Sequence, residues 1–244
     1  MKFAVQLYSL REHIKEGKDL LNILEEVKKI GFDGVEFAGF FGLSAEELRA
    51  KLDEVGLVCV GMHMGLGDFE PEKLDETLKF VHTLGAKTAG IGGADTETET
   101  ALQHVIDVLG AADKKAQEEG VKVYFHNHTH EFTQPLFATK AGTIFDRLKE
   151  ACHMQVDTYW SFHAGMENYQ LITENKDRIV HLHIKDGLDG TPKALGEGNN
   201  KLDVVVKAAK DAGIEWLILE NDDPVPDGLS DITRSMAWLN ANAR

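Results

Sequence analysis

Strand and helix patterns alternate along the whole chain, and this alternation is the feature that most constrains the fold. Short apolar runs of β type, such as residues 3–7 and 57–63, are each followed by an amphipathic stretch of helical period. Parallel strands need crossover connections, so this alternation favours a parallel sheet covered by helices. Eight such units fit into 244 residues without a linker or low-complexity segment. The sequence therefore predicts an α/β fold, a (β/α)8 TIM barrel formed by residues 1–244 as a single domain.

The expected strands and helices follow from the apolar periodicity and from the glycines that end several helices. We expect strands at 3–7, 34–40, 57–63, 87–91, 121–130, 154–159, 179–186 and 216–220. We expect helices at 18–30, 45–55, 71–84, 98–119, 142–151, 169–177, 202–212 and 230–243, and a loop at 187–200. A doubly wound open sheet is the rival architecture, but it requires a glycine-rich turn after the first strand. The residues at that place, Tyr8 to Glu12, contain no glycine, and the barrel is therefore preferred.

Charge and cysteine content exclude several classes of protein. The net charge of −15 repels phosphate backbones and anionic membranes, so we expect neither a nucleic acid nor a membrane partner. Only two cysteines, Cys59 and Cys152, are present, which favours a reducing compartment. Residues 1–10 lack a signal-peptide pattern, and no apolar run reaches the ~20 residues that span a bilayer. A soluble cytoplasmic protein is expected.

Polar side chains gather at the C-terminal ends of the predicted strands. In the stretch VKVYFHNHTH, alternation places Tyr124, His126 and His128 on one face of a strand. His183 and Lys185 share a face of a later strand, and a carboxylate ends the last apolar run. In a TIM barrel these strand ends meet at one rim, where the chemistry of such barrels is concentrated.

The histidines on or beside predicted strands, together with two carboxylates, predict a metal centre. These residues are His63, His126, His128, His181, His183, Asp157 and Glu220. A single histidine of this kind is more often a core residue. Several of them converging with carboxylates need a shared partner, since unpaired carboxylates are rarely buried. His13, His82, His104 and His153 lie on helices or connections and are expected to be surface or packing residues.

Four ordered motifs resemble the xylose isomerase-like barrel superfamily. They are Asp157-Thr-Tyr-Trp160 with Ala164-Gly165, His181-Leu-His-Ile-Lys-Asp186, Leu195-Gly-Glu-Gly-Asn199 and Leu217-Ile-Leu-Glu220. The superfamily contains sugar isomerases, ketose 3-epimerases, inosose dehydratases and endonuclease IV. The resemblance spans nearly the whole chain, and it implies the fold more specifically than the substrate.

The resemblance also implies a set of metal ligands. Members typically bind a divalent ion through a Glu, an Asp, a His and a Glu on strands five to eight. Asp157, His183 and Glu220 match the last three, and the implied cofactor is Mn, Mg, Co or Zn. Strand five departs from the pattern, because it has His126 where the superfamily usually has Glu. Three roles for His126 stay open: fourth ligand, a group acting on the substrate beside three ligands and water, or packing beneath the site.

Further site residues are expected by comparison with the superfamily. We expect Lys185 either to polarise a substrate oxygen with its positive charge or to form an ion pair with Asp186 or Glu220. Glu131 contacts a sugar hydroxyl, or it is a solvated loop carboxylate. Trp160 stands where many relatives have a second histidine, and it either stacks on a sugar face or packs at the rim.

His63 and His128 complete the expected substrate contacts, and residues 195–199 are expected to close over the site or simply to form turns.

The predicted activity is that of a metal-dependent sugar isomerase or epimerase, which removes the proton next to the carbonyl of a keto sugar or polyol. Glu220 is the expected base, with His126 or His128 as its partner. The missing Glu on strand five leaves open a lyase, hydrolase or dehydratase acting on keto-glycosides or inososes through the same enediolate.

A nuclease of the endonuclease IV type is disfavoured by the negative net charge and by the absence of the additional metal ligands that such a nuclease needs. A non-catalytic sugar-binding barrel would bind no metal. We expect a small sugar as partner, and a homo-oligomer is left open.

Overall fold

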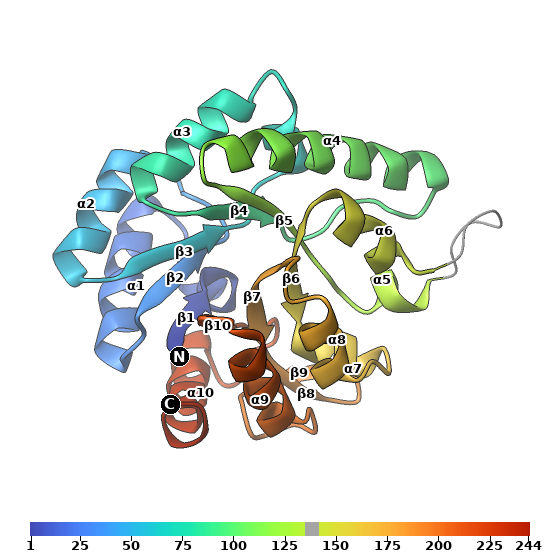
Figure 1. Ribbon diagram of the computed structural model, residues 1–244. Helices are drawn as coiled ribbons and strands as arrows, with labels where there is room; N and C mark the ends of the chain where they lie inside the picture. Colours follow the sequence, from blue (N-terminus) through green and yellow to red (C-terminus); the bar gives the residue numbers. More distant parts are fainter. Residues whose placement is uncertain (135–141) are drawn as a thin grey trace.

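The computed structural model describes residues 1–134 and 142–244, and eight parallel strands form a barrel surrounded by helices (Figure 1). The barrel strands are β1 (Lys2–Gln6), β2 (Gly34–Phe37), β3 (Val58–Met62), β4 (Thr88–Ile91), β5 (Lys122–His126), β6 (His153–Asp157), β7 (Ile179–Ile184) and β10 (Trp216–Leu219). Their order in the sheet is β3-β2-β1-β10-β7-β6-β5-β4. The ends of this sheet meet where His63 bridges Gly90 and Met64 N donates to Gly90 O at 2.8 Å. The predicted (β/α)8 TIM barrel is confirmed.

The outer layer consists of helices whose apolar faces pack on the strands. The longer helices are α1 (Gly17–Ile30), α2 (Ala45–Val55), α3 (Leu74–Leu84), α4 (Glu99–Glu118), α6 (Ile144–Ala151), α8 (Asn168–Glu174), α9 (Leu202–Ala212) and α10 (Gly228–Asn242). Helix α2 starts with the predicted capping box, in which Ser44 Oγ accepts from Glu47 N and Glu47 accepts from Ser44 N. None of the described helices is long and apolar enough to cross a membrane.

Short elements at the strand ends differ from the prediction. The strand expected at 154–159 ends at Asp157, because Asp157 Oδ1 accepts from the backbone N–H groups of Tyr159 and Trp160 and caps α7 (Thr158–His163). The strand expected at 121–130 ends at His126 and is followed by α5 (His130–Thr133). The predicted loop 187–200 contains an antiparallel ribbon of β8 (Asp186–Leu188) and β9 (Thr191–Lys193). Two 3₁₀ helices, η1 (Leu7–His13) and η2 (Leu66–Phe69), were not predicted.

The barrel interior is polar toward the C-terminal ends of the strands. Among the residues that the structure describes, the apolar cluster inside the barrel is small and consists of Ala4, Val60 and Ile218, with Trp216 packed against it. The remaining interior is occupied by Gln6, Glu36, Tyr124, Gln155, His181 and His183, all fully or almost fully buried. Buried polar groups of this kind must satisfy one another through hydrogen bonds. The polar interior therefore forms a rigid base for the rim above it.

Candidate active site

Four potential ligand atoms meet at the C-terminal rim of the barrel. His126, Asp157 and His183 lie at the ends of β5, β6 and β7, and Glu220 directly follows β10. One N or O atom of each side chain lies within 4.8 Å of the others, and all four residues are buried. The structure thus brings together the four residues that were predicted to bind a metal.

Each of these side chains is oriented by contacts of its own. His183 Nδ1 lies 3.0 Å from Glu220 Oε2, and its Nε2 lies 2.5 Å from Glu36 Oε2. His126 Nδ1 lies 2.9 Å from Gln155 Oε1, and its Nε2 faces Asp157 Oδ2 at 3.9 Å. With Asp157 Oδ1 engaged in capping α7, Asp157 Oδ2 is buried and makes no hydrogen bond, although the Lys185 ammonium lies 3.3 Å away. A buried carboxylate oxygen held only by an ion pair can accept a further partner.

Glu36, near the end of β2, was not identified from the sequence. Its Oε1 accepts from Tyr124 OH at 2.5 Å and from Gln155 Nε2 at 2.6 Å, and its Oε2 accepts from Gln6 Nε2 at 2.7 Å. Burial alone would raise the pKa of Glu36, but His63 and His183 outweigh burial and hold the pKa well below its usual range. Glu36 is therefore an ionised carboxylate beneath the rim, and it fixes the ring of His183.

Gln155 was also missed, and it connects Glu36 to the other imidazoles. Its Oε1 lies 2.8 Å from His63 Nε2 and 2.9 Å from His126 Nδ1, so both rings donate to it. Its Nε2 lies 2.9 Å from His181 Nδ1, which accepts. With Nδ1 of His126 protonated, Nε2 of the neutral ring is left with a free lone pair toward Asp157. Burial lowers the pKa of His126 well below its usual value, which keeps the ring neutral.

Lys185 is fully buried beside the four potential ligands. Its Nζ lies 3.0 Å from Glu220 Oε2 and 3.3 Å from Asp157 Oδ2, and it also contacts Asp222. The ion pair with Glu220 that the sequence suggested is present. The suggested pair with Asp186 is wrong, because the Asp186 carboxylate accepts from backbone N–H groups of the following loop.

The charges and donor atoms of this cluster fit a divalent cation. Burial lowers the pKa of His183, but Glu220 and Glu36 outweigh burial and raise it to about 10, so without a metal His183 and Lys185 are two cations. To bind a cation, His183 must release the Nδ1 proton that faces Glu220, while Nε2 keeps its proton toward Glu36. When ionised, the four carboxylates of Glu36, Asp157, Glu220 and Asp222 exceed them by two charges. Burial raises the pKa of Asp157, so a bound cation would favour the ionised form that burial disfavours. Two imidazoles and two carboxylates are a usual donor set for zinc, manganese or cobalt. Asp157 Oδ2, which makes no hydrogen bond and faces Lys185 at 3.3 Å and His126 at 3.9 Å, is a potential ligand atom for such a cation.

A cavity of about 360 Å³ opens onto the cluster and is lined by Tyr8, Ala38, His63, Gly92, His126, His128, Glu220 and Asp222. Its volume lies within the range of ~300–1,000 Å³ typical of small-molecule sites. Of the predicted substrate contacts, His63 and His128 line this cavity, whereas Trp160 and Glu131 do not. The Trp160 ring instead lies 5.0 Å from Lys185 Nζ.

Glu131 is fully buried, so the suggestion of a solvated loop carboxylate is wrong. Its Oε2 accepts from His128 N at 2.7 Å, and its Oε1 lies 2.9 Å from His130 Nε2. Glu131 therefore holds the backbone of His128 at the cavity wall.

The loop at 195–199 is held by Asp186, the first residue of β8, two residues after the end of β7. The N–H groups of Gly196, Gly198 and Asn200 all donate to the Asp186 carboxylate at 2.9–3.0 Å. The glycines thus serve a defined turn, and closure over the site stays a prediction.

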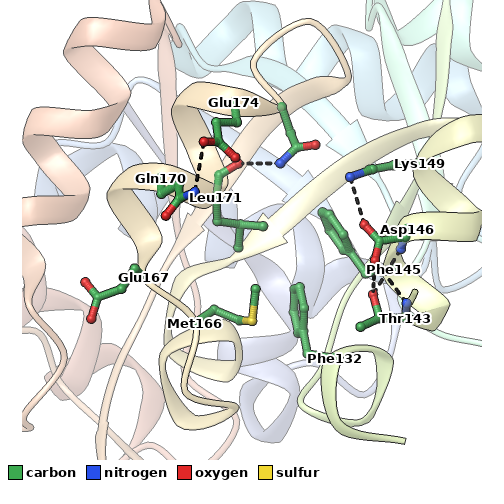
Figure 2. Close-up of a pocket in the computed structure, with 11 residues that line it drawn as sticks. Phe132, Thr143, Phe145, Asp146, Lys149, Met166, Glu167, Gln170, Leu171 and Glu174 are labelled. Atoms are coloured by element: carbon green, nitrogen blue, oxygen red, sulfur yellow. Dashed lines mark hydrogen bonds and ion pairs between the residues drawn. The ribbon is translucent and has the colours of Figure 1, made fainter. Parts of the chain in front are cut away.

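A different cavity, of about 250 Å³, lies on the outside of the barrel between α5, α6 and α8 (Figure 2). Phe132, Phe145 and Met166 are among its apolar lining residues, and no histidine lines it. Its polar groups are largely engaged with one another, as in the 2.8 Å contact of Lys149 with Asp146. This cavity lacks the donor set of the rim, so the rim is the candidate active site.

Known proteins resemble this chain in fold and in part of its sequence. An inosose dehydratase from Geobacillus kaustophilus is 25% identical over 67% of this chain and 61% of that protein, so the chain spans less than two thirds of the relative's length. Among solved structures, a sugar phosphate isomerase/epimerase from Parabacteroides distasonis has a TM-score of 0.79 at 19% identity, covering 98% of both chains. An AP endonuclease, family 2, from Brucella melitensis has a TM-score of 0.78 at 17% identity, covering 100% of this chain and 99% of that one. At 19% and 17% identity, the similarity to these solved structures shows a shared fold and nothing about function.

The model of the xylose isomerase-like TIM barrel family matches residues 24–242, which include every residue of the cluster described above. The chain belongs to the xylose isomerase-like TIM barrel family.

Proposed function

We propose that the protein is a divalent-metal-dependent sugar isomerase or epimerase, which removes the proton next to the carbonyl of a keto sugar or polyol. The observation that carries this proposal is the buried set of His126, Asp157, His183 and Glu220, whose donor atoms lie within 4.8 Å of one another. This set borders a cavity large enough for a small sugar. A cation of the Mn, Mg, Co or Zn type held by these four residues would polarise the carbonyl and acidify the neighbouring carbon.

Glu220 is the proposed base. It lines the cavity, and although burial raises its pKa, Lys185 and His183 outweigh burial and lower the pKa well below its usual value. The carboxylate is therefore ionised, as a general base must be. The low pKa reflects the charges of Lys185 and His183 and makes Glu220 a weaker base than a free carboxylate. The ammonium of Lys185, 3.0 Å from Glu220 Oε2, stabilises negative charge that develops on the substrate oxygen.

Imidazoles line the cavity beside Glu220. The ring centroids of His126 and His128 are 4.9 Å apart, and His128 Nδ1 is buried without a hydrogen-bond partner. We assign His128 to a substrate hydroxyl and His126, through Nε2, to the cation. Proton transfer by His126 is the alternative to this role, because its Nδ1 donates to Gln155. His63, fixed by Gln155 at 2.8 Å, contacts the substrate from the β3 side. Trp160 covers the buried Lys185 and restricts its access to water.

A dehydratase or lyase acting on inososes or keto-glycosides is the second candidate. It is favoured by the strand-five position, where His126 stands instead of a second carboxylate base. The 25% identical relative is an inosose dehydratase, which agrees with this possibility. Both candidates begin with the same proton removal, and they differ in whether a hydroxyl or glycosidic oxygen then leaves. Product analysis by mass spectrometry separates them, because only the second candidate produces an unsaturated product.

The test is exchange of the α-proton with solvent deuterium, followed by NMR on a panel of keto sugars, inososes and keto-glycosides. We expect metal-dependent exchange with wild-type protein, and its loss in Glu220→Gln and His183→Ala. Matched controls are Glu215→Gln and His104→Ala, whose side chains are 60% and 59% exposed. Undiminished exchange in Glu220→Gln would refute the assignment of Glu220 as the base. Cleavage of abasic duplex DNA at catalytic rates would overturn the proposal in favour of a nuclease.

A further inference from the structure

We infer that the substrate is a glycoside of a keto sugar, whose aglycone or second ring is held at the rim by Tyr8, Phe41 and Arg11. This inference rests on the proposed function and specifies its substrate class. The three residues lie on the segments that follow β1 and β2, beside the cavity and outside the cluster of potential metal ligands.

Tyr8 belongs both to the catalytic cavity and to the outer rim. It lines the cavity of about 360 Å³, yet 45% of the residue is exposed. Its backbone is fixed, because Tyr8 N donates to Gln6 Oε1 at 3.1 Å and Gln6 is itself bound to Glu36. The aromatic ring is therefore presented to solvent from a rigid base.

Arg11 holds one face of this ring. Its guanidinium carbon lies 4.3 Å from the centre of the Tyr8 ring. Its Nη1 donates to Tyr8 O at 3.0 Å, and its Nη2 donates to Asp222 O at 2.6 Å. In the part of the chain that the structure describes, no carboxylate forms an ion pair with Arg11. The side chain is thus exposed but ordered, and it joins Tyr8 to the strand end that carries Asp222.

Phe41 has a positive φ angle, which is unusual for a bulky residue. Leu43 N donates to Phe40 O at 3.0 Å, and the two residues between them, Phe41 and Gly42, have φ values of 51° and 80°. Positive φ at both central positions is the pattern of a type I′ turn, which favours Asn, Asp or Gly. A bulky residue there is strained, yet 42% of Phe41 is exposed, so burial in the core does not explain it. Strain without a folding benefit points to a role in binding.

A small apolar cleft connects these residues to the cavity. It is lined by Tyr8, Arg11, Ala38, Gly39 and Phe41 together with apolar side chains beneath them, and it shares Tyr8 and Ala38 with the catalytic cavity. Its volume of about 30 Å³ is too small for a ring, so a second ring would lie on the exposed faces of Tyr8 and Phe41 and not inside the cleft. A sugar bound at the cluster therefore has an aromatic surface beside it, on the outward side. Aromatic rings of this kind bind the apolar face of a second sugar or an aryl group.

Large exposed apolar side chains of the described residues are concentrated on the side of the rim where Tyr8 and Phe41 lie. Six large ones are exposed, and four of them, Phe41, Tyr8, Val225 and Leu188, follow β2, β1, β10 and β7. These four strands are neighbours in the sheet. The apolar residues are thus concentrated along one arc of the rim, where a glycoside would leave the cavity.

The test compares methyl and phenyl 3-keto-β-D-glucopyranoside in the α-proton exchange assay. We expect KM for the phenyl glycoside to be about threefold to tenfold lower than for the methyl glycoside, as aromatic stacking provides. Tyr8→Ala and Phe41→Asn should each reduce the ratio of the two KM values toward one. Tyr169→Ala is the matched control, because this tyrosine is 39% exposed but lies on α8, and it should leave the ratio unchanged.

Equal KM values for the two glycosides in wild-type protein would overturn the inference, and so would an unchanged ratio in both rim variants. Calorimetric binding of phenyl and methyl β-D-glucopyranoside repeats the comparison without chemistry. Absence of exchange with every keto sugar would refute the proposed function, whereas a tighter complex with the phenyl glycoside, lost in Phe41→Asn, would still support the rim site.

Discussion

Replacing Glu36 by glutamine tests the network that orients the potential metal ligands. The two oxygens of Glu36 each accept two hydrogen bonds, from Tyr124 and Gln155 on one side and from Gln6 and His183 on the other. In Glu36→Gln one oxygen becomes an NH2 group, so two buried donors lose their acceptor whichever way the amide is turned. Each unsatisfied buried donor costs about 1–3 kcal/mol. The sum is about 2–6 kcal/mol.

The lower half of this range is expected, because neighbouring groups can partly adjust. Tyr124 OH also lies 3.2 Å from Met62 O and can donate there instead. We therefore predict that Glu36→Gln lowers the free energy of unfolding by about 2–4 kcal/mol in urea denaturation at pH 7. Divalent-metal affinity should fall about 10–100-fold, as is usual when the partner of a ligating histidine is removed.

The pH dependence provides a further check. Since the pKa of Glu36 is depressed in the folded protein, its contribution is present above the unfolded pKa of about 4.3 and is lost as the pH falls below that value. The difference between wild type and Glu36→Gln should be constant from pH 6 to 8 and shrink in acid. Glu150→Gln, an exposed change on α6, is the control. A Glu36→Gln protein within about 0.5 kcal/mol of wild type would refute the reasoning.

Three further predictions concern stability. Burial raises the pKa of Asp231 to about 6, so ionisation of this group destabilises the fold as the pH rises from about 4 to 6. Asp231→Asn should therefore raise the free energy of unfolding by about 1 kcal/mol at pH 8 and leave it unchanged at pH 4, as measured by urea denaturation at both pH values. Phe41→Asn should raise the unfolding free energy by about 0.5–1 kcal/mol, because asparagine tolerates positive φ, and an unstrained Phe41 would show no gain. Gly61→Ala should cost about 1–3 kcal/mol, since its Cβ would lie 2.9 Å from Thr88 Oγ1 and 3.1 Å from Tyr124 OH; an unchanged melting temperature would contradict this crowding.

The fold was predictable because each strand and helix carries its own periodic signal. Alternation of apolar and polar residues located β5 and β7, and it also placed His126 and His183 on the inner face. The strand ends were harder to predict, since a single side chain decides them. Asp157 ends β6 by capping α7 through its own carboxylate, an effect that strand periodicity cannot reveal.

The residues beneath the rim were missed for a physical reason. Glu36 is the third residue of the short strand Gly34–Phe37, and Gln155 lies in the middle of β6, where a polar residue usually faces solvent. Their importance arises from contacts with residues 88 and 119 positions away in the sequence. One signal was available: Glu36, like Glu220, is a carboxylate near the end of an apolar strand. The partners of Lys185 could not be predicted for the same reason, because its three carboxylate partners lie at the ends of two other strands.

The most direct test of the account is the number of divalent ions bound per chain. Protein treated with chelator and then dialysed against Mn2+ should bind one ion per chain by elemental analysis and electron paramagnetic resonance, and the ion should raise the melting temperature. Asp157→Asn should lower the affinity by more than about 100-fold, whereas the surface variant His82→Ala should bind normally. Equal binding of Mn2+ by wild type and Asp157→Asn, or no binding by wild type, would contradict a cation held by His126, Asp157, His183 and Glu220.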